Sequence, residues 1–268
     1  MVQFFTTESS DPAIDFTGLR FFTLKSPALG RRADVTVWVP EGTEGVENLP
    51  VVVLLHGVYG SQWAWALKGG AHVVARGLLA AGEIRPVALA MPSDGLWGDG
   101  SGYLTHRAAD YERWIVEEVP ALLREQLPAV SENSPVFLAG LSMGGYGALR
   151  LGAKYAAQFQ GFSGLSSITR FEELGDFFEN GDLSRLRAEG VIEENAIDVL
   201  LENRHRLPPF RFDCGLADPL LESNRTLHRQ LTEAGLPHGY FEYEGGHEWP
   251  YWHGHLGDTL RFFDGLLS

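Results

Sequence analysis

The sequence predicts an α/β protein with a mostly parallel sheet covered by helices on both faces, and three observations carry this prediction. First, apolar runs typical of buried strands alternate with amphipathic stretches typical of helices. Second, the run Val51–Leu55 is apolar at every position and rich in valine, as expected of a strand inside a parallel sheet. Third, the 268 residues are 44% apolar and 21% charged, a balance that can bury one large core. We therefore expect a single domain over residues 1–268.

The first part of the chain predicts two antiparallel strands. Residues 19–24 and 33–39 have strand patterns, and the second has apolar side chains at alternate positions, Val35, Val37 and Val39. Pro40 and the Glu-Gly-Thr-Glu-Gly sequence after it are typical of a polar turn. The turn separates these strands from the buried strand at Val51–Leu55.

Beyond that buried strand, helix and strand patterns alternate. The expected elements are helix 63–81, strand 86–91, helix 108–127, strand 135–139, helix 145–159, strand 162–165, strand 210–214, helix 220–234, strand 240–243 and helix 256–267. Repeated strand-then-helix units imply parallel strands with helices on both faces. Ligands bind beyond the carboxyl ends of such strands, so the strand-to-helix junctions are where chemistry is expected.

Residues 169–207 depart from this alternation. The segment is rich in Glu, Arg and Leu, and it has helical periodicity over residues 171–178 and 196–201. We interpret it as a small helical insertion that caps the strand ends, and not as a separate domain.

The composition argues against several classes of partner. With 21 basic and 35 acidic residues, the formal net charge of −14 would repel the phosphates of a nucleic acid. No stretch approaches the roughly 18 uninterrupted apolar residues of a membrane span. The first ten residues lack the basic start and apolar run of a signal peptide. The single cysteine, Cys214, permits no internal disulfide. We expect a cytoplasmic protein without nucleic-acid or membrane partners, and whether it forms a homo-oligomer stays open.

The most informative motif is Gly-x-Ser-x-Gly at Gly140, Ser142 and Gly144, directly after an apolar strand and before a helical pattern. A serine at this junction sits on a tight, strained turn with its hydroxyl exposed above the sheet. Side chains two residues to either side would collide with the neighbouring strand and helix, and glycine avoids the collision. The motif predicts Ser142 as a nucleophile, against the alternative of a glycine-rich turn with an incidental serine.

A serine nucleophile needs a neighbouring base, and histidine suits that task near neutral pH. His247 follows the strand 240–243 through a Gly-Gly turn, which places it at the carboxyl edge of the sheet, where Ser142 lies. The other histidines after the serine are His205 in the insertion, His228 in a helix, His238 at the amino end of a strand, and the pair His253 and His255. The spacing of that pair from His247 differs from the helical zinc motif, so packing is their preferred role and no metal is expected.

The acid should follow the strand 210–214, where two candidates lie. Asp213 is inside the strand, where a structural hydrogen bond is the expected role. Asp218 follows a short turn at the carboxyl end, and Pro219 then opens a helix. A helix cap is the competing role for Asp218. We favour it as the group that orients the imidazole and stabilises the imidazolium.

Backbone donors should stabilise the oxyanion that forms during acyl transfer. The amide of Met143, directly after the serine, is one candidate, and Val58, in the loop after the buried strand, is the other, with Gly57 shaping the turn. Aromatic residues cluster at the same edge, and the candidates for substrate contact, with Gly57, are Tyr59, Trp63, Trp97 and Trp249. Trp65, Tyr103 and Trp252 belong to the same set, of which we expect only a part to line the pocket.

Taken together, these residues resemble the esterase D-like branch of the α/β-hydrolase superfamily, which includes tributyrin esterases, S-formylglutathione hydrolases, feruloyl esterases and mycolyltransferases. The resemblance spans residues 35 to about 262 and is most similar to the intracellular tributyrin esterase type. Its motifs are Leu55-His-Gly-Val58, Met91-Pro-Ser93, the serine motif from Gly140, Cys214-Gly-Leu-Ala-Asp218 with Asn224, and Gly246-His-Glu-Trp249 with Trp252. The resemblance implies an α/β-hydrolase fold, a triad of Ser142, Asp218 and His247, oxyanion donors at Val58 and Met143, and no cofactor.

The expected function is that of a serine carboxylesterase that hydrolyses short-chain acyl esters through an acyl-Ser142 intermediate. Leu141 stands where the formylglutathione hydrolases usually carry histidine, which argues against that substrate. Three alternatives stay open: an acyltransferase, an S-formylglutathione or feruloyl-type esterase on the same triad, and a non-catalytic binding protein. Every triad role is filled, which argues against the last.

Overall fold

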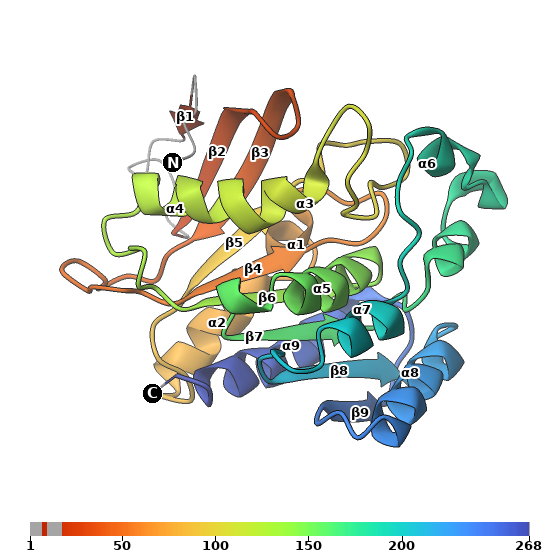
Figure 1. Ribbon diagram of the computed structural model, residues 1–268. Helices are drawn as coiled ribbons and strands as arrows, with labels where there is room; N and C mark the ends of the chain where they lie inside the picture. The colour runs from red at the N-terminus through yellow and green to blue at the C-terminus, as the bar shows by residue number, and fades with distance from the viewer. Residues whose placement is uncertain (1–6, 10–17, 268) are drawn as a thin grey trace.

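The computed structural model describes residues 7–9 and 18–267, in which nine strands form a single sheet (Figure 1). Its order is β1-β2-β3-β5-β4-β6-β7-β8-β9. The strands are β1 Thr7–Ser9, β2 Leu19–Ser26, β3 Arg31–Trp38, β4 Val51–Leu55, β5 Ala88–Pro92, β6 Val136–Leu141, β7 Gly161–Leu165, β8 Phe210–Gly215 and β9 Gly239–Tyr243. Strands β1, β2, β3 and β5 pair antiparallel in turn, and all pairs from β5 to β9 are parallel. The predicted fold class, a mostly parallel sheet of the α/β-hydrolase type, is confirmed.

Helices cover both faces of the sheet, and alternate residues of each central strand face opposite cores. In β4, Val51, Val53 and Leu55 belong to one buried cluster, whereas Val52 and Leu54 belong to the other. One face is covered by α1 Ala64–Leu67, α2 Ala71–Ala80 and α9 Trp249–Asp264. The other is covered by α3 Tyr111–Arg113, α4 Val119–Gln126, α5 Met143–Lys154, α7 Ala196–Glu202 and α8 Leu221–Glu233, with α5 in front of the sheet and α9 behind it in Figure 1.

The strand order reverses at β4, because β5 lies on one side of it and β6 on the other. A crevice forms beyond the carboxyl ends of two such strands, where the loops that follow them diverge. The loop after β4 and the turn after β6 therefore lie next to each other. These are the segments that carry Val58 and Ser142.

The insertion folds into short helical turns: η3 Phe171–Asp176, η4 Glu179–Gly181, α6 Ser184–Ala188 and, at its end, α7. The segment around Glu194, which we call the base of the insertion, contacts α5. There, Glu194 forms an ion pair with the fully buried guanidinium of Arg150. Tyr146 of the same helix donates a hydrogen bond to the Glu194 carbonyl at 2.5 Å. The base of the insertion is therefore tied to the helix that begins at the candidate nucleophile.

Several expected helix boundaries are wrong. The helix predicted over residues 63–81 is two helices, because Gly70 has a left-handed φ of 61° between α1 and α2. Helix α9 begins at Trp249, seven residues before the expected start at 256, with Pro250 in its first turn. A π-helical turn, η1 Trp114–Glu118, and the 3-10 turn η2 Ala156–Gln158 interrupt or end the helices expected over residues 108–127 and 145–159.

In residues 7–9 and 18–267, no helix combines the length and the apolar character that crossing a membrane would require.

Candidate active site

Ser142 sits on a sharp turn between β6 and α5, with φ 55° and ψ −119°. The backbone packs so closely around this turn that no side chain fits two residues to either side of the serine. A Cβ at Gly140 would lie 2.2 Å from the Gly144 carbonyl oxygen, and one at Gly144 would lie 2.2 Å from the Leu55 carbonyl oxygen. The predicted glycine requirement therefore has a direct steric basis, and the amino end of α5 lies directly beyond the serine.

The three residues predicted for a triad meet at the carboxyl edge of the sheet. The Nε2 atom of His247 lies 3.0 Å from Ser142 Oγ. Its Nδ1 atom lies 3.0 and 3.1 Å from the two carboxylate oxygens of Asp218. Because an ionised carboxylate can only accept, the Nδ1–H must donate to Asp218, and this leaves Nε2 free to accept the serine hydroxyl proton. This arrangement can deprotonate the serine hydroxyl as it attacks.

The environment of Asp218 keeps this carboxyl ionised. Burial alone would raise its pKa, but the hydrogen bond and charge of His247, the Leu220 amide and the Ser166 hydroxyl together hold the pKa below its ordinary value. The Leu220 amide donates to Oδ1 at 2.8 Å, so the capping role considered for Asp218 coexists with its contact to His247. Ser166, at the carboxyl end of β7, is buried with a left-handed φ of 46°. No motif in the sequence pointed to this residue.

The loop after β4 places a second set of groups beside the serine. A Cβ at Gly57 would lie 3.3 Å from Ser142 Cβ, so the backbone approaches the nucleophile closely there. Among the described residues, the amides of Val58 and Met143 have no hydrogen-bond acceptor. The Val58 and Met143 side chains both approach Gly100, since a Cβ there would lie 3.7 Å from Val58 Cγ1 and 2.3 Å from Met143 Sδ. Backbone amides without an acceptor, close to the nucleophile, are what an oxyanion requires.

His56 holds this loop in shape. Its Nδ1 lies 2.7 Å from the Gly57 carbonyl oxygen, and the Asp94 amide donates to its Nε2 at 3.2 Å. Together, these two contacts place the ring proton on Nδ1. Tyr103, which is fully buried, donates from its hydroxyl to the His56 carbonyl at 3.1 Å.

The family model described as "Putative esterase" matches residues 26–263. The chain belongs to this esterase family. It is a serine esterase, and thus a carboxylic ester hydrolase. Among curated proteins, an acetyl esterase from Caldicellulosiruptor saccharolyticus is 29% identical over 233 residues, which cover 81% of this chain and 84% of the relative. An esterase from Mycobacterium tuberculosis (strain CDC 1551 / Oshkosh) is 25% identical over 259 residues, and there the match covers 85% of this chain but only 55% of the relative.

Solved structures of other esterases and hydrolases share the fold of this esterase. A ferulic acid esterase superposes with a TM-score of 0.82 at 25% identity, over 98% of this chain and 99% of the other. An S-formylglutathione hydrolase from Staphylococcus aureus superposes with a TM-score of 0.76 at 21% identity, over 90% of this chain and 96% of the other. The second likeness shows the fold alone.

The aromatic residues predicted near the site divide into two groups in the esterase. Tyr59 and Trp63 are exposed, at 62% and 41%. Trp97 is partly buried and packs its ring against His106 and Arg185, and Trp249, also partly buried, contacts Trp65 and Trp252 edge-on. Trp65 and Tyr103, by contrast, are core residues, with hydrogen bonds to the carbonyls of Leu55 and His56. The first group is at least partly exposed, so its rings are open to contact by a ligand.

His253 and His255 lie within α9 and have partners of their own. His253 Nδ1 is 2.8 Å from the Gly69 carbonyl oxygen, and His255 stacks on Tyr243 with ring centroids 4.1 Å apart. In the part of the chain that the structure describes, no group of three or more His, Cys, Asp or Glu side chains is arranged to hold a metal ion.

Phe177 of the insertion is a site residue that sequence reasoning missed. Its ring centroid lies 4.8 Å from that of His247. Nothing local marks it, because Phe177 and Phe178 both belong to a helical pattern that suits a packed insertion.

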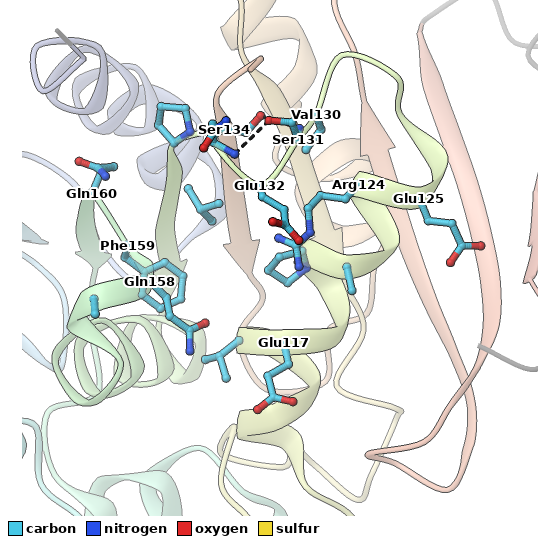
Figure 2. Close-up of a pocket in the computed structure, with 17 residues that line it drawn as sticks. Glu117, Arg124, Glu125, Val130, Ser131, Glu132, Ser134, Gln158, Phe159 and Gln160 are labelled. Atoms are coloured by element: carbon cyan, nitrogen blue, oxygen red, sulfur yellow. Dashed lines mark hydrogen bonds between the residues drawn. The ribbon is translucent and has the colours of Figure 1, made fainter. Parts of the chain in front are cut away.

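A cavity of about 1000 Å³ lies at the opposite, amino edge of the sheet, between α4 and the segment that leads into β7. Figure 2 shows Glu117 and Arg124 on the helical side and Gln158 and Gln160 on the other. The 17 residues drawn there include none of the triad. The three residues predicted for the triad lie instead at the carboxyl edge.

Proposed function

We propose that the esterase hydrolyses esters of short acyl chains, with Ser142 as nucleophile, His247 as general base and Asp218 as the orienting acid. The observation that carries the proposal is the pair of contacts on one imidazole, 3.0 Å from Ser142 Oγ and 3.0 Å from Asp218 Oδ2. The distance from Ser142 Oγ to His247 Nε2 is within the reach of direct proton transfer, and the contact with Asp218 orients the imidazole. The acetyl esterase relative supports a short acyl group.

In the acylation step, Ser142 Oγ attacks the ester carbonyl carbon while its proton passes to His247 Nε2. The carbonyl oxygen becomes negatively charged and is held by the amides of Val58 and Met143, which have no protein acceptor among the described residues. The carbon–oxygen bond to the alcohol then breaks, and the alcohol leaves with the proton from His247. Asp218 stabilises the imidazolium throughout this step.

Deacylation repeats these steps with a water molecule as the nucleophile. His247 Nε2 accepts a proton from a water molecule whose oxygen attacks the acyl-Ser142 carbonyl carbon. The bond to Ser142 Oγ breaks, the serine recovers its proton from His247, and the free acid is released. Atoms and charge balance without a cofactor.

The restriction to short acyl chains is supported by the crowding around the serine. Gly57 leaves no space for a side chain, since a Cβ there would lie 2.9 Å from Leu141 Cδ1. The rings of Phe177 and Trp252 both pack against His247. The exposed rings of Tyr59 and Trp63 would meet the alcohol part of an ester outside this crowded centre.

A rate series on p-nitrophenyl esters from acetate to dodecanoate, on wild type and Ser142→Ala together, tests the proposal. We expect rates that peak at short chains and are lost in the variant, whose fold is checked by circular dichroism. Adding an alcohol during turnover and measuring free acid against transferred ester separates hydrolysis from acyl transfer. Rates that rise toward dodecanoate would overturn the acyl-chain assignment, and full activity in Ser142→Ala would overturn the nucleophile.

A further inference from the structure

The imidazole of His247 contacts two aromatic rings. The ring of Phe177 has its centroid 4.8 Å from that of His247, with the planes inclined by 34°. The ring of Trp252 lies at 5.1 Å and 88°, an edge contact. The hydrogen bond to Asp218 fixes one ring nitrogen of His247, and the two aromatic contacts limit rotation of the imidazole about that bond.

The two aromatic residues come from different parts of the chain. Trp252 belongs to α9, which begins two residues after His247, so its position follows from the local helix. Phe177 comes from the insertion, where its amide donates to the Leu174 carbonyl at the end of η3. The sheet and its helices therefore supply one of these two aromatic contacts of His247, and the insertion supplies the other.

The insertion tip, residues 177–179, is also linked to the oxyanion loop, the segment after β4 that carries Val58. The Glu179 amide donates to the carboxylate of Asp99 at 2.8 Å. The Asp99 carbonyl oxygen accepts from the Tyr59 amide at 2.9 Å. Tyr59 follows Val58 directly and has a left-handed φ of 55°. A path of two hydrogen bonds therefore links the insertion tip to the residue next to the proposed oxyanion donor.

These contacts matter physically because His247 must carry a positive charge in the transition state. An aromatic face close to a cation stabilises it. An imidazole held at the correct angle also avoids the large rate losses, about 100-fold for a displacement of 1 Å, that follow from poor alignment. The insertion tip acts on both the base and the oxyanion loop at once.

We propose that Phe177 and Glu179 of the insertion form a positioning element of the catalytic machinery, in which Phe177 holds the imidazole of His247 and the Glu179 amide, through Asp99, holds the loop that carries Val58. The proposal deepens the proposed function and rests on it. It assigns the insertion a role in turnover itself, in addition to substrate selection.

The test compares three variants. Phe177→Ala removes the ring, Phe177→Tyr keeps it, and Phe178→Leu loosens the packing of the buried neighbouring residue without changing the residue against His247. We expect Phe177→Ala to lower kcat about 10- to 100-fold on both the acetate and the butyrate ester, with KM nearly unchanged. Phe177→Tyr should restore most of kcat, and Phe178→Leu should leave kcat within a few-fold of wild type while lowering thermal stability.

Two results would overturn the proposal. One is an unchanged kcat in Phe177→Ala, and the other is a change in KM or acyl-chain ranking alone, which would make Phe177 a substrate contact. Labelling by a small fluorophosphonate separates this failure from failure of the proposed function. A wild type that is not labelled refutes the nucleophile assignment, whereas a labelled wild type with an equally fast Phe177→Ala refutes only the positioning role.

Discussion

Asp213 and Asp218 lie on the same strand and the turn after it, yet their carboxyls meet opposite environments. Burial raises the pKa of Asp213 to about 6, although Arg211 and the Tyr251 hydroxyl partly oppose the shift. At Asp218, burial is outweighed by His247 and the Leu220 amide, so the pKa lies below its ordinary value. Asp218 is therefore fully ionised near neutral pH beside the imidazole. Asp213, whose Oδ1 accepts the Tyr251 hydroxyl at 2.9 Å, serves the packing of α9 on β8.

Replacing Asp218 with Asn should reduce kcat by about 10³- to 10⁴-fold while leaving the fold intact. The amide can still accept from Leu220, but it can present a donor to His247 Nδ1 and favour the wrong tautomer. Steady-state rates on p-nitrophenyl acetate measure the effect. Asp213→Asn is the matched control, because it changes a neighbouring carboxyl that does not contact His247, and its kcat should stay within a few-fold of wild type. An equal loss in both variants would refute the assignment of the acid.

The raised pKa of Asp213 predicts a specific pH dependence of stability. Its folded pKa of about 6 lies above the ordinary value of 3.8, so the folded state binds more protons in this window. The stabilisation from the protonated carboxyl is complete below about pH 4 and is lost as the pH rises through about 6. Urea unfolding at several pH values, on wild type and Asp213→Asn, measures this. The wild-type free energy of unfolding minus that of the variant should fall between pH 4 and 7 and then stay constant, and a difference that rises over this range would contradict it.

The parts of the site that could be predicted from the sequence are those whose signals are local. Gly140, Ser142 and Gly144 lie within five residues, and their spacing is itself the steric requirement of the turn. The meeting of Asp218 and His247 also follows from topology, because both lie just beyond neighbouring parallel strands, β8 and β9.

Other features depend on contacts that the sequence does not mark. The break between α1 and α2 lies where a Cβ at Gly69 would be 2.8 Å from Trp249, a residue 180 positions later. Helix α9 begins at Trp249, before the expected start at residue 256, and the ring of Trp249 packs against Trp65 and Trp252. Phe177 reaches His247 only through the folded insertion.

The strained backbone of Ser142 predicts a difference between two inactive variants. Both Ser142→Ala and Ser142→Gly lack the hydroxyl, but alanine keeps the side chain in an unfavourable conformation, with φ 55° and ψ −119°. Such strain costs about 1–3 kcal/mol, whereas glycine's extra unfolded-state entropy costs about 0.5–1 kcal/mol. We expect Ser142→Gly to be more stable than Ser142→Ala by about 1 kcal/mol in urea unfolding. A less stable glycine variant would show that the turn stores no strain at this position.

Close packing at the turn predicts the outcome of two glycine-to-alanine substitutions. At Gly144 the added Cβ would lie 2.2 Å from the Leu55 carbonyl oxygen and 2.6 Å from that of His56, and neither backbone can move without displacing the oxyanion loop. We expect Gly144→Ala to be destabilised by at least about 3 kcal/mol or to fail to fold, as overpacking of a rigid site commonly costs 1–3 kcal/mol or more. At Gly77, inside α2, a Cβ would meet nothing within 4 Å, so Gly77→Ala should be more stable than wild type by about 0.5–1 kcal/mol. Thermal and urea unfolding of both variants, with p-nitrophenyl acetate activity as the second measurement, separates the outcomes. Gly77→Ala is the control and should keep full activity. An active and fully stable Gly144→Ala would show that the serine turn tolerates a side chain and that the close approach to Leu55 is not required.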